Sequence, residues 1–126
     1  MKFIISAMRQ FLGHLIALID LLSRGRKQQR SDDGQKQVET ELAGMSLYQF
    51  YACPFCIKTR RAMHKLNLPI QTRSASTGSP FRQELLAEGG KIQVPCLRID
   101  NDEHSQWMYG SSAIIEYLQQ RFAAVN

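Results

Sequence analysis

The chain has 126 residues, of which 44% are hydrophobic, and a formal net charge of +5. This length allows one ordinary domain, and the apolar fraction is typical of a folded chain and not of a disordered one. The positive excess forms no basic stripe interleaved with aromatic residues, so we expect no nucleic-acid partner; an anionic small ligand or an anionic membrane surface suits it better.

The first segment, residues 3–22, is mostly apolar and about as long as a helix that crosses a bilayer. At the α-helical period its polar and small residues fall within one narrow arc, and large apolar residues and alanine occupy almost all of the remaining circumference. The arc consists of Ser6, Arg9, Gln10, Gly13, His14, Ala17 and Asp20. We interpret residues 1–23 as a membrane-anchor helix that either spans the bilayer or lies in its interface. The alternatives are a helix packed on the domain or on a second copy, and a cleaved signal peptide.

Basic residues follow this segment directly: Arg24, Arg26, Lys27 and Arg30 outnumber the single Lys2 on the other flank. If the helix spans the membrane, its basic flank should stay in the cytoplasm. This orientation places the rest of the chain at the cytoplasmic face of the inner membrane, in a reducing compartment.

Residues 24–44 are polar and charged, and we interpret them as a plain linker. A short helical turn around Val38 to Leu42 is the alternative. The folded domain is then expected over residues 45–126.

The domain begins with a strand over residues 46–51, which are rich in β-forming residues and alternate in polarity. Proline and serine at favoured first-turn positions predict three helices, and glycine pairs or Leu-Pro end two of them. In chain order, we predict a helix over 54–67, a strand over 70–73, a helix over 80–87, strands over 93–99 and 106–109, and a last helix to Phe122. The order β-α-β-α-β-β-α predicts an α/β, thioredoxin-like domain. Strands that follow helices should be parallel, and the turn at 100–102 should make the last pair antiparallel.

Cys53 and Cys56 form a C-x-x-C pair where the first strand leads into the first helix. Unpaired N–H groups and the helix dipole stabilise an anion at such a place, so we expect Cys53 to exist partly as a thiolate near neutral pH. Cys56 follows one helical turn later and can resolve a mixed disulfide formed at Cys53. We therefore interpret Cys53 as the nucleophile and Cys56 as the resolving thiol. Metal binding and an incidental pair are the alternatives, but a structural zinc site usually needs four ligands, so we expect no metal.

Pro95 falls inside the predicted strand over 93–99, at a position where a central strand normally excludes proline. A cis Val94–Pro95 bond would kink the chain and leave the backbone of Val94 free to pair with an extended thiol peptide. A trans proline on an edge strand is the alternative. We interpret the next residue, Cys96, as a buried core cysteine, with a third redox thiol as the alternative.

Gly110, Ser111 and Ser112 precede the last helix. The free N–H groups of that helix start, together with one serine hydroxyl, suit a carboxylate. Simple helix capping is the alternative, and the pattern does not choose between the two serines.

These features, in this order, resemble the glutaredoxin family and the N-terminal domain of glutathione transferases over residues 46–122. LYQFYACPFCIKTRRAMHKLNLPI is similar to the family's first strand, its C-P-[YF]-C site and its first helix. QVPCL is similar to its V-P segment, and YGSSAIIEYL to the serine-containing segment that holds the γ-glutamyl end of glutathione. The N-terminal helix and linker resemble those of bacterial glutaredoxin-like proteins with a membrane-associated leader.

The resemblance implies that glutathione is the co-substrate and that Cys53 forms the mixed disulfide with it. It implies glutathione contacts at Tyr51, Phe55, Val94, Pro95, Ser111 and Ser112. Val94 would pair with the tripeptide backbone, and Ser111 would hold the γ-glutamyl group. Gly110 stands where transferase relatives usually carry an acidic residue, and no all-helical second domain follows, so we expect no conjugating activity.

We therefore expect a glutathione-dependent disulfide oxidoreductase that acts on disulfide-containing or glutathionylated proteins. One alternative is a non-enzymatic protein in which Cys53 and bound glutathione hold an iron–sulfur cluster between two copies. Another is a disulfide oxidase or isomerase on the outer side of the membrane, which the basic flank argues against.

Overall fold

A computed structural model of the whole chain describes residues 2–23, 27–101 and 103–126. Its elements in chain order are α1 (Lys2–Ser23), α2 (Asp32–Leu42), β1 (Met45–Gln49), α3 (Pro54–Lys65), β2 (Gln71–Ser74), α4 (Pro80–Gly89), β3 (Cys96–Asp100), β4 (Ser105–Tyr109) and α5 (Ser111–Phe122). From β1 onwards this order is the predicted β-α-β-α-β-β-α. The thioredoxin-like fold expected from the sequence is confirmed.

The four strands form one sheet in the order β2-β1-β3-β4. β1 pairs with β2 in parallel, and β3 pairs with β4 antiparallel, both as predicted. The parallel direction predicted for β3 is wrong, because β3 runs antiparallel to β1. The reason lies in the path of the α4 segment. β2 ends at Ser74, which pairs with Gln49, and β3 begins at Cys96, which pairs with Tyr48. The α4 segment therefore returns the chain to the same sheet edge that it left. A helix makes two strands parallel only when it carries the chain back to the opposite edge.

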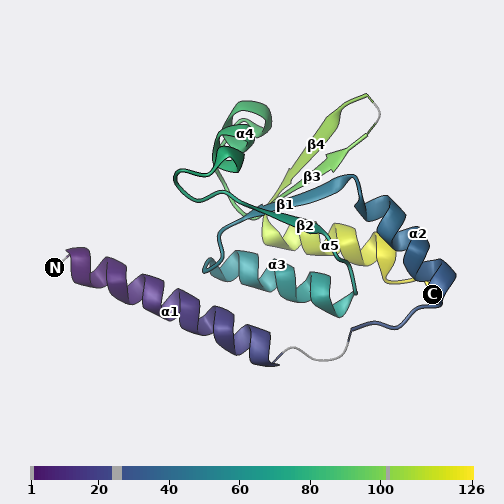
Figure 1. Cartoon of the computed structure of the whole chain (residues 1–126), viewed down its shortest axis with the longest axis horizontal. Helices are drawn as coiled ribbons and strands as arrows, with labels where there is room; N and C mark the ends of the chain where they lie inside the picture. The colour runs from purple at the N-terminus through teal and green to yellow at the C-terminus, as the bar shows by residue number, and fades with distance from the viewer. Residues whose placement is uncertain (1, 24–26, 102) are drawn as a thin grey trace.

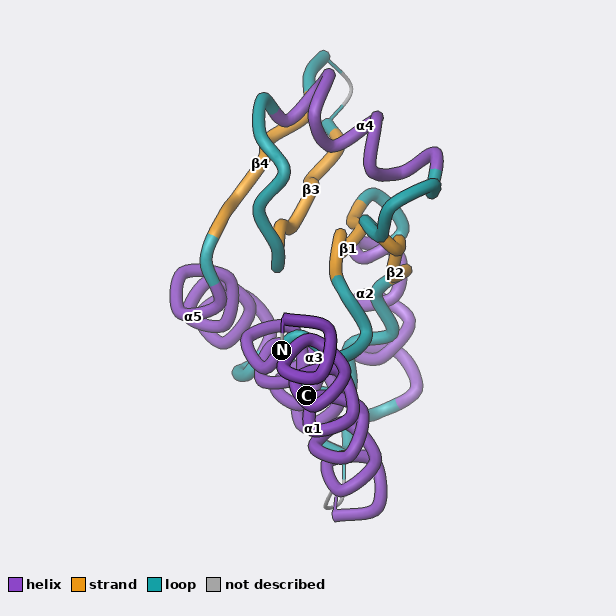
Figure 2. Tube along the Cα trace, turned by 90° about the vertical axis from the view of Figure 1, so that its left-hand side faces the viewer, coloured by secondary structure: helices purple, strands orange, loops and turns teal. Residues whose placement is uncertain are grey.

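Helices cover both faces of this sheet (Figure 1), with α3 and α5 on one face and α4 on the other. The tube view in Figure 2 shows the same separation of α4 from the other helices. Alternate residues of β1 pack against the helices on opposite faces of the sheet. Leu47 packs with the α3 and α5 side chains, and Tyr48 packs with Leu85 of α4. The period of two along the strand therefore separates two apolar cores.

Helix α2 corrects the interpretation of residues 24–44 as a plain linker. Ser31 caps it by accepting a hydrogen bond from the Gly34 N–H at 3.1 Å, and Val38 and Leu42, one turn apart, are buried in the main core. The preceding segment is tied to the domain as well, because Arg30 donates to the Val125 carbonyl at 2.9 Å. The polar composition of this segment did not indicate a helix. Because α2 covers only one edge of the core, it needs only a narrow apolar stripe.

Helix α1 lies alongside α3 (Figure 1) and turns its narrow polar arc towards the domain. Gly13 and Ala17 of that arc are buried, whereas the large apolar side chains from Phe3 to Ile19 are exposed, from 38% at Ile16 to 85% at Phe3. Within residues 2–23, 27–101 and 103–126, no helix has both the length and the hydropathy that a bilayer crossing requires. The interpretation of residues 1–23 as a membrane anchor stays a prediction.

Candidate functional site

Cys53 is the residue that caps the N-terminus of α3. Its φ of −75° and ψ of 125° are extended, and its carbonyl accepts the first helical bond from the Ile57 N–H at 2.9 Å. Pro54 occupies the first helical position, where a missing N–H costs nothing. Cys53 is partly exposed, and the unpaired N–H groups of the first turn face the same end of the helix. The predicted position at the junction of strand and helix is confirmed.

Cys56 differs sharply from Cys53 in its surroundings. It is fully buried, and its sulfur accepts a hydrogen bond from the Phe50 N–H at 3.5 Å. Burial, together with the neighbouring Cys53 thiol with which it shares a hydrogen bond, raises the pKa of Cys56 to about 12. Cys56 is therefore a neutral thiol at neutral pH, although it lies within reach of Cys53.

Arg60 of α3 holds the loop that leads to Cys53. Its guanidinium donates to the carbonyls of Tyr51 at 2.6 Å and Phe50 at 3.3 Å, and it also bonds the side chain of Gln49. The same group lies 5.3 Å from the centre of the Tyr51 ring. Arg60 therefore positions the loop that leads to Cys53 and places a positive charge near the Cys56 thiol. Its spacing from Cys53, two helical turns along α3, was the available signal.

The Val94–Pro95 peptide bond is cis, as predicted. Pro95 lies immediately before β3 and not inside it, which corrects the predicted strand start. The carbonyl of Pro95 accepts a hydrogen bond from the Gly110 N–H at 3.4 Å, so this turn is joined directly to the start of α5. Ser111 there is buried and Ser112 is exposed.

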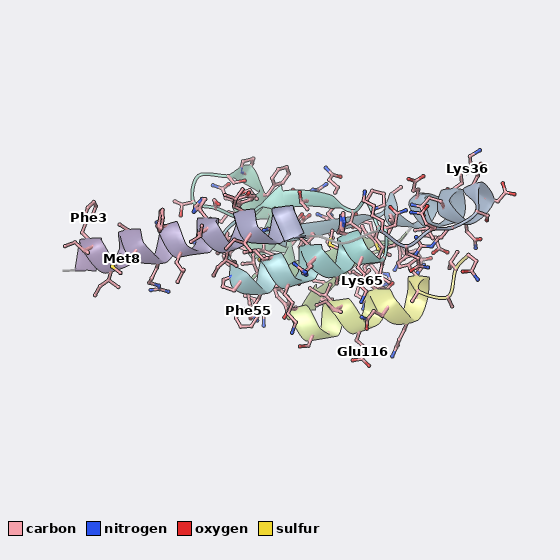
Figure 3. All side chains as sticks on the ribbon, turned by 90° about the horizontal axis from the view of Figure 1, so that it is seen from below. Phe3, Met8, Lys36, Phe55, Lys65 and Glu116 are labelled. Atoms are coloured by element: carbon pink, nitrogen blue, oxygen red, sulfur yellow. The ribbon has the colours of Figure 1, made fainter. Side chains whose placement is uncertain are left out.

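Sheet register brings these separate segments to one edge. Tyr48 of β1, Cys96 of β3 and Tyr109 of β4 pair across neighbouring strands. Three segments are adjacent to those residues in the sequence and therefore lie at the same edge of the sheet: the Cys53 loop, the Val94–Pro95 turn and the Gly110 turn. Phe55, 62% exposed, projects from the first turn of α3 (Figure 3).

A groove with a volume of about 790 Å³ opens beside Cys53. One of its walls is the loop with Tyr51 and Cys53, and the facing wall is the polar arc of α1. Helical periodicity indicated the arc but gave no reason to expect it beside Cys53, because amphipathic helices usually bury their apolar side.

Cys96 lies away from this groove in the layer under α4, where it packs with Tyr48, Ala75 and Leu85. It is fully buried, and burial raises the pKa of its thiol to about 11. The interpretation of Cys96 as a buried core cysteine is confirmed.

Comparison with known proteins shows the family. Residues 47–125, more than half of the chain, match the family described as "Glutathione S-transferase, N-terminal domain". No curated protein sequence matches the chain. Glutathione transferase Omega 3C from Trametes versicolor is similar in structure, with a TM-score of 0.56 and 20% sequence identity, over 79% of this chain and 43% of that one.

Two other solved structures have a similar arrangement. Maleylacetoacetate isomerase from Anaeromyxobacter dehalogenans, with bound dicarboxyethyl glutathione and citrate, gives a TM-score of 0.50 and 20% identity over 64% of this chain and 37% of that one. Oxidized glutaredoxin 2 from Chlamydomonas reinhardtii gives a TM-score of 0.45 and 16% identity over 77% of this chain and all of the other. This chain spans less than half the length of the transferase and of the isomerase.

Proposed function

Because the chain belongs to the glutathione S-transferase N-terminal domain family, we propose that it is a glutathione-dependent thiol–disulfide oxidoreductase acting through Cys53. One observation carries this proposal, namely the inequality of the two thiols in Cys53-Pro54-Phe55-Cys56. Cys53 is partly exposed at a helix N-terminus, and Cys56 is fully buried one turn further on. A catalytic thiol must be accessible and ionisable, whereas its partner needs only to be within reach.

In the first step, the Cys53 thiolate attacks the glutathione sulfur of a mixed disulfide between glutathione and a second thiol. The S–S bond of the substrate breaks, a new bond forms between Cys53 and glutathione, and the second thiol leaves as a thiolate that takes a proton from water. The N–H groups of the first turn of α3 stabilise the Cys53 thiolate before the attack.

In the second step, the thiolate of a free glutathione attacks the glutathione sulfur bound to Cys53. Oxidised glutathione leaves, and Cys53 returns to the thiolate. Cys56 is the other group that can resolve this intermediate, but its pKa of about 12 keeps the thiolate fraction very small at neutral pH. Resolution by free glutathione is therefore the main route.

Glutathione would occupy the edge of the sheet that carries the Val94–Pro95 turn and the start of α5. The backbone of Val94 is placed to pair with the extended tripeptide, and the N–H groups at Ser111 and Ser112 suit its γ-glutamyl carboxylate. Tyr51 and Phe55 offer exposed aromatic surface on either side of Cys53 along the chain. With glycine at position 110, the γ-glutamyl amino group lacks the carboxylate that relatives supply there.

A mixed-disulfide experiment tests this proposal. Cys56→Ser incubated with oxidised glutathione at pH 7 should gain one glutathione, at Cys53, detected by intact mass and peptide mapping. The matched variant Cys53→Ser should gain none, because burial keeps Cys56 and Cys96 protonated. Glutathione attached at Cys96 in the first variant, or equal labelling of the two variants, would contradict the assignment.

We also propose that the exposed face of α1 lies on the surface of a membrane, at the cytoplasmic face of the inner membrane. The face is formed by Phe3, Ile4, Ile5, Met8, Phe11, Leu12, Leu15, Ile16, Leu18 and Ile19, all at least 38% exposed. Apolar side chains on a helix that lies flat enter the acyl boundary, and the basic residues after α1 would meet anionic headgroups. Glutathione chemistry needs a reducing compartment, which favours the cytoplasmic side.

Vesicle binding separates this proposal from a helix that stays in water. The wild type should sediment with vesicles of anionic phosphatidylglycerol, and Phe11→Glu should lower the bound fraction at least about tenfold, since one buried aromatic side chain contributes about 1.5–3 kcal/mol. Gln37→Glu on the exposed side of α2 is the charge-matched control and should bind as the wild type does. Equal binding of both variants would show that the α1 face does not enter the bilayer.

A further inference from the structure

The orientation of α1 is the opposite of what an amphipathic helix usually adopts. Its polar arc faces the domain and its apolar side is exposed, although burial of the apolar side would be the more favourable packing. Arg9, Gln10 and His14 consequently line the groove of about 790 Å³, opposite Tyr51, Ala52 and Cys53. Because these polar side chains line the groove beside Cys53, they are placed to contact a molecule that binds there.

A close backbone approach holds α1 in this position. A Cβ atom on Gly13 would lie 2.7 Å from the Ala52 carbonyl oxygen, which is too close for a contact, and 3.0 Å from the Ala52 Cβ, which is unusually tight. Ala17, one turn further along, is also buried. Small residues at these two positions therefore let the helix touch the residue that precedes Cys53.

Arg9 brings a positive charge to the wall of the groove that α1 forms. In the described part of the chain, no aspartate or glutamate lines the groove, and no hydrogen bond or ion pair engages the Arg9 guanidinium. His14 is held in place, with its Nδ1 2.8 Å from the Gln10 carbonyl and its ring 5.8 Å from the Tyr51 ring centre. The guanidinium is thus available to a ligand, and its planar pair of N–H groups matches a carboxylate.

The groove lies on the side of Cys53 away from the proposed glutathione site. It includes Ser76, which follows β2, whereas Val94 and Ser111 belong to the β3 and β4 side. The sheet order β2-β1-β3-β4 places these two sides on opposite flanks of β1, the strand that leads to Cys53.

We propose that this groove is the subsite for the half of the disulfide substrate that is not glutathione, and that Arg9 binds a carboxylate on that half. The inference rests on the proposed function, because it assigns the two sides of Cys53 to the two thiols of one mixed disulfide. Cys53 attacks the glutathione sulfur in line with the breaking S–S bond, so the sulfur of the second thiol leaves on the side opposite Cys53. The carbon chain of that thiol then extends sideways towards the groove. The substrate class is a carboxylate-bearing thiol joined to glutathione.

Two probe disulfides test this subsite. One joins glutathione to 3-mercaptopropionate, which carries a carboxylate, and the other joins it to 2-mercaptoethanol, which is neutral. Arg9→Gln should raise KM for the first by about tenfold, as expected for loss of a charge-assisted hydrogen bond, and leave KM for the second unchanged. Lys36→Gln removes the same charge from the exposed face of α2, far from α1 (Figure 3), and should change neither value.

A second variant controls for a change in folding. Gly13→Val should push α1 away from Ala52 and reproduce the selective KM increase, with the circular dichroism and thermal unfolding of the domain retained. If Arg9→Gln alters both probes equally, or neither, the subsite assignment is wrong. Absence of turnover by the wild type on both probes would instead contradict the proposed function, so the two failures are distinguishable.

Discussion

Replacing Cys53 by serine should lower the turnover of a glutathione mixed disulfide by more than about a thousandfold, the scale of loss seen when a nucleophile is removed. A serine hydroxyl does not ionise near neutral pH and cannot form the disulfide intermediate. Cys56 cannot take over, because it is fully buried and its pKa is about 12. The measurement is the glutathione-dependent rate followed through the oxidation of NADPH by glutathione reductase.

Two matched cysteine variants make this result specific. Cys56→Ser should keep most of the rate, since free glutathione resolves the intermediate at Cys53. Cys96→Ala should also keep it, because Cys96 packs in the layer under α4 and not in the groove. A rate in Cys53→Ser within tenfold of the wild type would show that another group carries the reaction. A loss in Cys56→Ser as large as that in Cys53→Ser would show that the buried thiol is required in every turnover.

Local signals in the sequence predicted most of the domain and the position of the Cys53 and Cys56 pair. Alternation marked β1, and proline at a first helical position marked α3 and α4, with Cys53 directly before the first of these. Proline inside the predicted strand over 93–99 indicated the cis Val94–Pro95 bond. Each of these signals depends on a few neighbouring residues, which is why the sequence alone carries them.

The features that the sequence did not predict all depend on packing between distant segments. The direction of β3 depends on which sheet edge α4 leads back to, and no local pattern records that. The role of Arg60 depends on the path of the loop at Tyr51, which its guanidinium bonds and stacks upon. The inward polar arc of α1 depends on a contact between Gly13 and Ala52, 39 positions later in the chain. Helical periodicity found the arc but could not say which side meets the domain.

The segment between α1 and β1 is also held by contacts with distant parts of the chain. Gln28 donates from its N–H to the Lys65 carbonyl at 2.9 Å, and Arg30 donates to the Phe122 carbonyl at 3.1 Å, at the end of α5. These bonds join residues that are far apart in sequence, and partial burial lowers the pKa of the Arg30 guanidinium from its ordinary value. A plain linker would make no such contacts. Residues 27–42 therefore belong to the folded domain and not to a tether.

Leu42→Ala should consequently lower the free energy of unfolding of the domain by about 3 kcal/mol, within the range for a buried leucine that leaves a cavity. Leu42 is only 3% exposed and packs in the main core with residues of α3, α5 and the sheet. Its neighbour along the apolar stripe of α2, Val38, is buried one turn earlier. Denaturant unfolding followed by circular dichroism gives the change directly, provided that the slope with denaturant stays constant.

Glu39→Ala on the exposed side of the same helix is the matched control, and it should change the free energy of unfolding by less than about 0.5 kcal/mol. If residues 24–44 were a linker, both substitutions would be equally harmless, since neither side chain would contact the core. A loss below about 1 kcal/mol for Leu42→Ala would therefore restore the linker interpretation. A loss near the expected value, with Glu39→Ala unchanged, would show that the domain begins at least one helix earlier than its first strand.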